Sequence, residues 1–207
     1  MAPLKALCTE KFSEWSKFER DLNLKCIELT GDTNNDDDLS YVENANIICT
    51  TPEKFESMTR QWKNHRSIID SIKMVLIDEI HVLGDSSRGT IIEVVVSRLK
   101  NHALSLVEAH GNKDETSSFI RFIAISATIP NIYDIANWLG SCIHLQQTPA
   151  VVYQLDESYR PVRLNKIVIG YGMVSNLFAF DNYISHKLDN LIELYSKSKP
   201  TLIVSLI

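Results

Sequence analysis

The sequence predicts an α/β fold with a doubly wound, mainly parallel sheet. Short apolar segments with strand character alternate with longer segments of helical periodicity, which is typical of strands joined by crossover helices. In addition, the apolar segment 74–77 runs directly into two carboxylates, Asp78 and Glu79. Ligands of such sheets bind at the carboxyl ends of the strands, so this junction is also the first candidate for a functional site.

The first half of the chain is expected to hold two short strands among four helices. Segment 6–20 carries Leu7, Phe12, Trp15 and Phe18 near helical spacing. The two strands are short apolar runs that stop at turn residues, Thr-Gly-Asp in one case and Thr-Thr-Pro in the other. In chain order, the expected elements are a helix at 6–20, a strand at 25–29, a helix at 39–43, a strand at 45–49, and helices at 52–61 and 65–72.

The middle of the chain continues the alternation. The strand expected at 74–77 is followed by a long helix at 90–109, in which Ile91, Val94, Val95 and Leu99 lie on one side. A polar loop is expected at 111–118, because the segment consists of Gly, Asn, Ser, Thr and charged residues. A strand at 119–125 and a helix at 131–139 follow, and Gly140 ends this helix.

The pattern changes near residue 145, which suggests two domains, residues 1–150 and residues 151–207. The second is expected to begin with extended pieces at 151–155 and 164–169. A helix at 186–196 and an apolar strand at 201–207 would follow.

Composition sets modest limits on the function. The chain has 207 residues, 44% of them hydrophobic and 23% charged, and a formal net charge of −5. This charge is not that of a general nucleic-acid binder, so any contact with nucleic acid must come from locally placed groups. The four cysteines form no C-x-x-C pair, which favours buried or free thiols in a reducing compartment. Cys142 and His144 could supply two ligands of a metal site, but no second pair of ligands is evident.

The segment Asp78-Glu79-Ile80-His81 is the most informative in the chain. Carboxylates are seldom buried unless they are paired or hold a metal. An Asp at the end of a parallel strand can hold Mg²⁺ through water, and the adjacent Glu can position a water molecule for attack on a phosphate. The alternative is a strand that ends in a solvated acidic turn.

Three further junctions allow two interpretations each. Thr51-Pro52-Glu53 is a good helix start, and a helix N-terminus binds phosphate, although it can also be a plain cap. Thr30-Gly31 places a hydroxyl and an open backbone at the sheet edge, or forms an ordinary turn. Ser126-Ala127-Thr128 either lies beside the acidic strand and relays contacts from it, or caps the helix that follows.

An acidic loop resembles a calcium site. Asp32, Asn34, Asp36, Asp38, Ser40 and Glu43 fall at the ligand positions of an EF-hand loop. The position that requires Gly is Asp37, however, and the preceding element is a strand. A solvated acidic loop is therefore favoured, and calcium binding stays an alternative.

Five motifs in order make a specific family resemblance. They are Pro3-Leu4-Lys5-Ala6-Leu7, Leu29-Thr30-Gly31-Asp32, Thr50-Thr51-Pro52-Glu53-Lys54, Asp78-Glu79-Ile80-His81 and Ser126-Ala127-Thr128-Ile129-Pro130-Asn131. The series resembles the Ski-like group of superfamily-two DExH helicases, and within it the Mer-type ATP-dependent DNA helicases of meiotic crossover. RNA-processing helicases share these motifs and stay an alternative.

The resemblance implies a role for each matching position. Asp78 would coordinate Mg²⁺–ATP and Glu79 would position the attacking water. His81, with Ser126, Ala127 and Thr128, would couple the nucleotide to the strand-binding face. The residues that would lie along the single-strand track are Pro3, Lys5, Thr30, Gly31, Thr51 and Pro52. The implied fold is a RecA-like lobe of P-loop NTPase type, and the implied partners are single-stranded or branched DNA in the nucleus.

The departures from the family pattern lead to further expectations. The sequence contains no G-x-x-x-x-G-K-[ST] phosphate loop, and the similarity ends where the second lobe and its arginine finger would continue. We therefore expect a chain truncated at both ends, with a gap or an exposed edge in its sheet. By itself it is expected to have negligible ATPase activity, and a catalytically dead binding module is the alternative function.

Overall fold

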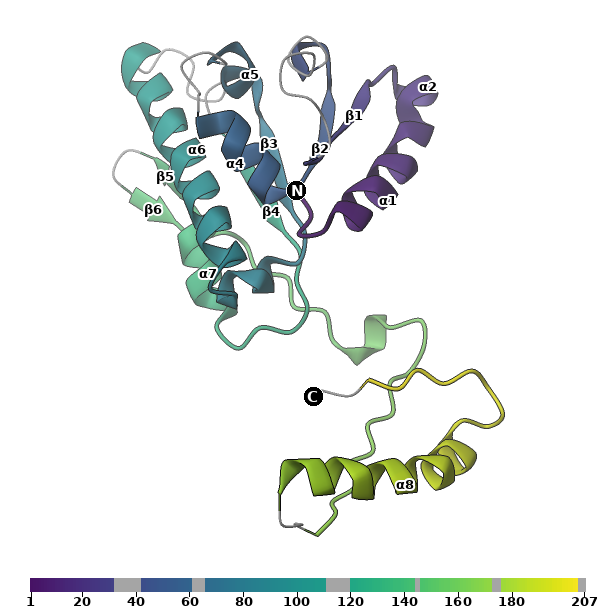
Figure 1. Ribbon diagram of the computed structural model, residues 1–207. Helices are drawn as coiled ribbons and strands as arrows, with labels where there is room; N and C mark the ends of the chain where they lie inside the picture. Colours follow the sequence, from purple (N-terminus) through teal and green to yellow (C-terminus); the bar gives the residue numbers. More distant parts are fainter. Residues whose placement is uncertain (32–41, 61–65, 111–119, 144–145, 173–175, 205–207) are drawn as a thin grey trace. The chain divides into compact units, whose positions relative to one another are not determined.

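The computed structural model describes residues 1–31, 42–60, 66–110, 120–143, 146–172 and 176–204. The chain forms two units, Met1–Tyr153 and Gln154–Ile207, and each is considered by itself. Figure 1 shows the first unit as a set of strands flanked by helices. Within the described residues, no helix has the length and apolar character needed to cross a membrane.

The first unit contains two pairs of parallel strands. Strand β1 (Cys26–Leu29) pairs with β2 (Ile47–Thr50), with Cys26 opposite Ile47. Strand β3 (Met74–Ile77) pairs with β4 (Arg121–Ala124), with Ile77 opposite Ala124. The prediction of an α/β fold with parallel strands is thus confirmed.

Residues Met1 and Ala2 join the two pairs of strands. The amino group of Met1 donates a hydrogen bond to the Leu76 carbonyl at 2.6 Å, and the Asp78 N–H donates to the Met1 carbonyl at 2.9 Å. This is the bonding pattern of a parallel ladder. On the other side, the Ala2 N–H donates to the Thr50 carbonyl at 3.1 Å. The carboxyl ends of β1, β2, β3 and β4 therefore lie at one edge, with the chain after Ala2 between β2 and β3 (Figure 1).

Helices cover both faces of the β1–β2 pair. Helix α1 (Lys5–Trp15) is followed by η1 (Ser16–Phe18) and α2 (Glu19–Leu22), and α1 contacts both strands. Cys26 lines a small apolar pocket with Trp15 and Phe18 on this side. On the other face, Leu29 packs against Ile68 of α5 (Arg66–Ser71). Alternate strand residues thus point to opposite, covered faces, as in a doubly wound sheet.

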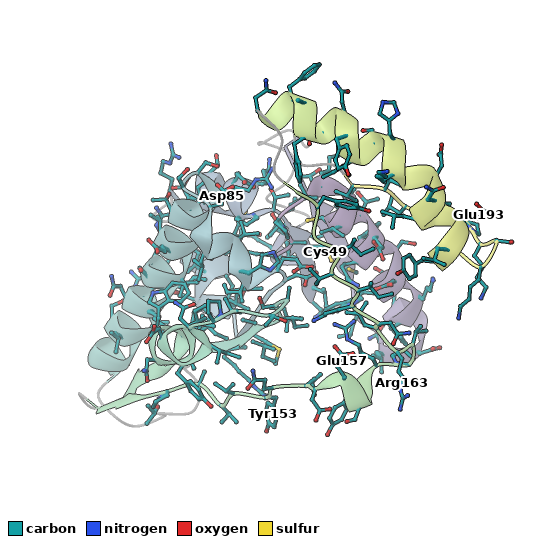
Figure 2. All side chains as sticks on the ribbon, turned by 90° about the horizontal axis from the view of Figure 1, so that it is seen from below. Cys49, Asp85, Tyr153, Glu157, Arg163 and Glu193 are labelled. Carbon is teal, nitrogen blue, oxygen red and sulfur yellow. The ribbon has the colours of Figure 1, made fainter. Side chains whose placement is uncertain are left out.

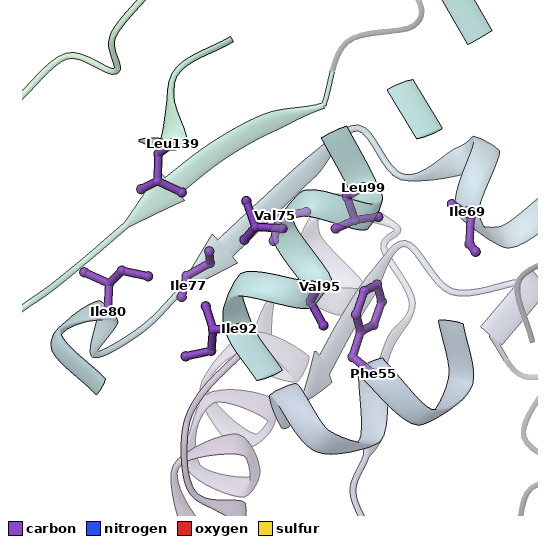
Figure 3. Packing of buried hydrophobic residues seen from close by; sticks show 10 residues of the cluster. Phe55, Ile69, Val75, Ile77, Ile80, Ile92, Val95, Leu99 and Leu139 are labelled. Atoms are coloured by element: carbon purple, nitrogen blue, oxygen red, sulfur yellow. The ribbon is translucent and has the colours of Figure 1, made fainter. Parts of the chain in front are cut away.

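The main core lies between β3 and the helices that follow β2 and β3. Helix α4 (Pro52–Arg60) and the long helix α6 (Arg88–His110) pack against each other. Figure 3 shows Phe55 of α4 close to Val95 and Leu99 of α6, with Val75 and Ile77 of β3 nearby. Val95 and Leu99 are almost completely buried, and burying a side chain of this size contributes about 1.5–3 kcal/mol each.

The turn into α6 is held by a side-chain cap. Asp85 follows η3 (Ile80–Gly84), and its Oδ1 accepts hydrogen bonds from the backbone N–H groups of Ser87 and Arg88 at 2.8 and 3.0 Å. The Ser87 hydroxyl, which donates to the same oxygen at 2.7 Å, and these backbone bonds hold the pKa of Asp85 at about 2, below its ordinary value of 3.8. One residue further on, a Cβ added at Gly89 would lie 2.3 Å from the Leu83 carbonyl oxygen, so only glycine fits this close approach.

The end of the first unit contains a hairpin that the sequence did not predict. After α7 (Ile132–Leu139), strands β5 (Ser141–Ile143) and β6 (Gln146–Thr148) pair antiparallel. The side chain of Lys100 on α6 donates to the carbonyl of Gly140 at 2.7 Å, which satisfies a free carbonyl at the end of α7. The turn of the hairpin lies outside the described residues.

The second unit corrects two predictions. It contains η4 (Glu157–Tyr159, Figure 2) and α8 (Leu177–Tyr195). The helix predicted at 186–196 starts nine residues earlier, because the Asn176 side chain caps it by accepting from the Ala179 N–H at 2.8 Å. Residues 201–204 form no strand, since apolar character alone does not make a strand without a paired neighbour.

Candidate functional site

The acidic pair lies at the carboxyl edge of β3, as predicted. Asp78 and Glu79 are both partly buried. Glu79 has φ 54° and ψ 47°, a left-handed conformation that non-glycine residues seldom adopt. The turn is fixed on both sides, because the Glu79 N–H donates to Asp78 Oδ1 at 3.0 Å and the Ile80 N–H donates to the Ile125 carbonyl at 3.0 Å. Strained residues of this kind cluster at functional sites.

His81 connects the acidic pair to the next strand. Its Nδ1 lies 3.1 Å from Glu79 Oε2 and 3.4 Å from the Ser126 hydroxyl. The structure thus brings together Glu79, His81 and Ser126, which come from the loops after β3 and β4. Ala127 and Thr128 are exposed in the loop that leads to α7, and no described hydrogen bond joins either to His81.

The predicted strand-contacting residues follow the same edge of the sheet. They come directly after Ala2, β1 and β2, whose carboxyl ends lie together. Lys5 and Gly31 are exposed, whereas Thr30 and Thr51 are only 3% and 9% exposed. Pro3 and Pro52 are also buried. At this edge Lys5 and the backbone at Gly31 are therefore exposed to solvent, whereas the two threonines are largely buried.

The N-terminus of α4 has the cap that the sequence suggested. The Lys54 N–H donates to Thr51 Oγ1 at 3.4 Å, and the Phe55 N–H donates to the Thr51 carbonyl at 3.1 Å. Thr51 thus serves as a helix cap, which was the plain alternative for this junction. Pro52 suits the first helical position because it has no N–H to satisfy.

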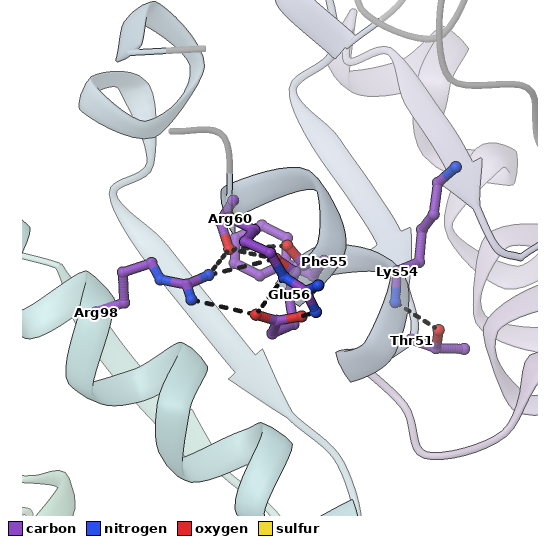
Figure 4. A network of polar contacts seen from close by, with 7 residues as sticks. Thr51, Lys54, Phe55, Glu56, Arg60 and Arg98 are labelled. Atoms are coloured by element: carbon purple, nitrogen blue, oxygen red, sulfur yellow. Dashed lines mark hydrogen bonds and ion pairs between the residues drawn. The ribbon is translucent and has the colours of Figure 1, made fainter. Parts of the chain in front are cut away.

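A polar network between α4 and α6 was not predicted from the sequence. Arg98 of α6 donates from Nη1 to Thr59 Oγ1 at 2.7 Å and from Nη2 to Glu56 Oε1 at 3.2 Å (Figure 4). Arg60 also bonds Glu56, and together the two guanidinium groups lower the pKa of the Glu56 carboxyl, Arg60 having the larger effect. The helical spacing of Glu56 and Arg60 could have indicated their pair, but nothing in the sequence points from Glu56 to Arg98.

Three thiols lie in the interior of the first unit. Cys8, Cys26 and Cys49 are buried and free, and the Sγ atoms of Cys26 and Cys49 are 4.0 Å apart. Burial raises the pKa of the Cys26 thiol to about 12, so these thiols are unreactive near neutral pH. Figure 2 labels Cys49 within the first unit.

In the described part of the chain, no three His, Cys, Asp or Glu residues form a metal-binding group. The acidic loop considered for calcium lies almost wholly outside it.

A cavity of about 690 Å³ lies beside α6 and is lined by Thr59, Ile69, Arg98 and His102 among others. Its lining includes neither Asp78 nor Glu79. The acidic edge is therefore the better candidate for nucleotide chemistry, because carboxylates, a histidine and backbone N–H groups meet there.

Comparisons with known proteins point to a helicase family. The model of the family described as DEAD/DEAH box helicase matches residues 1–135. The human "Probable ATP-dependent DNA helicase HFM1" is 44% identical over 205 residues, which cover 98% of this chain and 14% of that protein. The "ATP-dependent DNA helicase MER3" of Saccharomyces cerevisiae is 37% identical over 209 residues, covering 98% of this chain and 15% of that protein.

A solved structure shows the same fold. The crystal structure of the DUF1998 helicase MrfA bound to DNA and AMPPNP matches with a TM-score of 0.52 and 24% sequence identity. The match covers 67% of this chain and 18% of that chain. The present chain thus spans only a small part of the length of the proteins it matches.

Proposed function

The chain belongs to the DEAD/DEAH box helicase family, and from this premise we propose that it forms part of the motor of an ATP-dependent DNA helicase. Residues 1–150 would form a RecA-like lobe and residues 151–207 the connection to a second lobe. The names of the HFM1 and MER3 relatives, both called DNA helicases, support DNA as the substrate. By family resemblance, the enzyme would move 3′ to 5′ and act in the nucleus during meiotic recombination.

The arrangement at the carboxyl edge is the observation that carries the proposal. Asp78, Glu79, His81 and Ser126 meet there, on the same edge as the segments that follow Ala2, β1 and β2. A motor needs its hydrolytic groups and its strand-binding groups on one rigid frame, and the edge of a parallel sheet provides one.

The residues present fit a magnesium nucleotide. Carboxylate oxygens are the ligands that Mg²⁺ prefers, and Asp78 offers one at a partly buried sheet edge. Mg²⁺–ATP, when bound, supplies a phosphoryl group for transfer to water. Asp78 would hold the cation through water, and the Glu79 carboxylate would orient a water molecule and accept its proton. The turn at Glu79 aims this carboxylate by fixing its backbone on both sides.

Coupling is proposed to run through His81. The imidazole lies between the Glu79 carboxylate and the Ser126 hydroxyl, so a change at Glu79 can reach the loop after β4. Ala127 and Thr128 continue this loop toward α7 and would carry the change onward. In this path the loop after β4 is the part that can change its conformation. Strands β3 and β4 are held together by a parallel ladder.

Single-strand contact is proposed along the segments at Pro3–Lys5, Thr30–Gly31 and Thr51–Pro52. The Glu53 N–H at the start of α4, the open backbone at Gly31 and the Lys5 ammonium would touch phosphates. Such contacts position a strand without reading its sequence, as a translocating motor requires. DNA and RNA share these phosphates, so RNA stays a competing substrate.

A second candidate function applies to the 207 residues taken alone. They contain no G-x-x-x-x-G-K-[ST] sequence, and without a phosphate cradle and its lysine the transferred phosphoryl group is poorly stabilised. For this polypeptide by itself, strand binding without hydrolysis is therefore the function that the residues favour.

The proposal is tested by single-strand binding with charge-matched variants. Lys5 lies just after Ala2 at the carboxyl edge, whereas Lys25 precedes β1 at the opposite edge. Fluorescence anisotropy with oligo-dT should show weaker binding for Lys5→Met, with a logarithmic salt slope reduced by about 0.7, and no change for Lys25→Met. Equal effects of the two substitutions would contradict the proposed track. Parallel titrations with oligo-U compare RNA with DNA.

A further inference from the structure

Arg98 makes the longest-range side-chain link to α4 in the network of Figure 4. It lies 42 residues after Glu56 in the chain and binds three acceptors on α4 at once. Its Nη1 donates to Thr59 Oγ1 at 2.7 Å and to the Glu56 carbonyl at 3.3 Å, and its Nη2 donates to Glu56 Oε1 at 3.2 Å.

The environment of this link differs from that of an ordinary surface ion pair. The side chains of Arg98 and Glu56 are 27% and 14% exposed, whereas the Arg60 side chain on the same carboxylate is 72% exposed. A partly desolvated guanidinium that donates in a fork fixes geometry as well as energy. Arg60 joins two residues of one helix, so Arg98 alone ties α4 to α6 through this carboxylate.

The link complements the apolar contact between the same helices. Phe55 packs into the core with Val95 and Leu99, which holds α4 against α6 but leaves its rotation and sliding less restricted, because apolar contact is not directional. The bonds to Glu56 and Thr59, one turn apart, set the angle of α4 about its own axis. That angle decides where the Glu53 N–H points, which is the first N–H of the helix because Pro52 has none.

We propose that Arg98, with Glu56 as its partner, is a positioning residue for single-strand binding. It sets the orientation of α4 so that the helix start at Thr51 and Pro52 meets a backbone phosphate, without touching the nucleic acid itself. The inference rests on the proposed function, because it deepens the role given there to the start of α4.

The test compares two charge-matched substitutions on the same carboxylate. Arg98→Met removes the link between α4 and α6, whereas Arg60→Met removes an equal charge from Glu56 and leaves that link. Binding of the full chain to oligo-dT is measured by fluorescence anisotropy. Thermal unfolding followed by circular dichroism checks that each variant is folded under the binding conditions. We expect Arg98→Met to weaken binding about three- to tenfold and Arg60→Met to leave it nearly unchanged.

A double-mutant cycle separates positioning from a general structural effect. If Arg98 acts through the start of α4, its substitution costs little extra affinity once Thr51→Val has removed the cap that orders this start, so the two effects are not additive. Arg98→Lys keeps the charge but not the fork, is expected to bind like Arg98→Met, and replaces it in the cycle if that variant does not fold.

Each result bears on a different claim. Equal binding by the Arg98→Met and Arg60→Met variants, or full additivity of Arg98→Met with Thr51→Val, overturns the positioning role while the proposed function stands. Failure of the unsubstituted chain to bind oligo-dT overturns the proposed function itself, and the positioning role with it.

Discussion

The backbone N–H of Asp78 donates a hydrogen bond to the carbonyl of Met1 at 2.9 Å. This bond places the acidic pair beside the segment that leads into Pro3 and Lys5. Because Ala2 bonds to Thr50 on its other side, the proposed hydrolytic groups and the proposed strand track share one continuous edge.

Thr51 is expected to have two separable roles. Thr51→Val removes the hydroxyl that accepts from the Lys54 N–H, so it should lower the free energy of unfolding by about 1 kcal/mol and also weaken oligo-dT binding. Thr51→Ser keeps the hydroxyl and should preserve both properties. Denaturant titration and anisotropy measure the two effects. Unchanged affinity in the valine variant would mean that Thr51 only caps the helix.

Gly89 is expected to tolerate no larger side chain. Gly89→Ala would place a Cβ 2.3 Å from the Leu83 carbonyl oxygen, so the backbone must shift and stability should fall by about 1–3 kcal/mol. Gly84→Ala is the control, because nothing lies within 4 Å of the added atom, and its effect should stay within about 0.5 kcal/mol. Urea unfolding of both variants measures the difference. Similar midpoints would show that the turn relaxes freely.

Asp85 should make stability depend on pH in the acid range. Its folded pKa of about 2 lies below its ordinary value of 3.8, so its stabilising effect is complete above the ordinary value and is lost as pH falls toward 2. Urea midpoints of the unsubstituted chain and of Asp85→Asn should therefore differ near pH 5 and converge as pH approaches 2. A difference that stays constant over this range would contradict the assigned cap.

Much of the first unit was predictable because its signals are local. Apolar runs such as Met74–Ile77 and the start of α4 at Thr51 are encoded by adjacent residues, and both were placed correctly. The α8 boundary was placed too late because the cap at Asn176 and the helical spacing of Leu177, Phe180 and Ile184 were not recognised. Arg98 was not linked to Glu56 because only the packing of two helices, distant in sequence, brings them together.

The same contrast between local signals and long-range packing holds for the candidate site. The meeting of His81 with Ser126 was expected only on the condition that their strands are neighbours, which the pairing of β3 with β4 satisfies. The burial of Thr30 and Thr51 could not be foreseen, since hydroxyl residues at strand ends are compatible with either exposure. The roles of these residues in binding stay predictions.

The 207-residue polypeptide is expected to hydrolyse ATP negligibly with or without single-stranded DNA. It contains no phosphate-loop sequence, so Glu79 has no positioned phosphoryl group on which to act. A coupled phosphate-release assay should give equal background rates for the unsubstituted chain and for Glu79→Gln. DNA-stimulated hydrolysis that Glu79→Gln abolishes would contradict this expectation.

The most direct test of the shared edge is hydrogen–deuterium exchange of the chain with and without saturating oligo-dT. The account predicts slower exchange in peptides that cover Pro3–Lys5, Thr30–Gly31 and the start of α4, and no change at the opposite edge around Lys25 and Asn46. Protection confined to other segments, such as α6 or α8, would contradict the placement of the strand track.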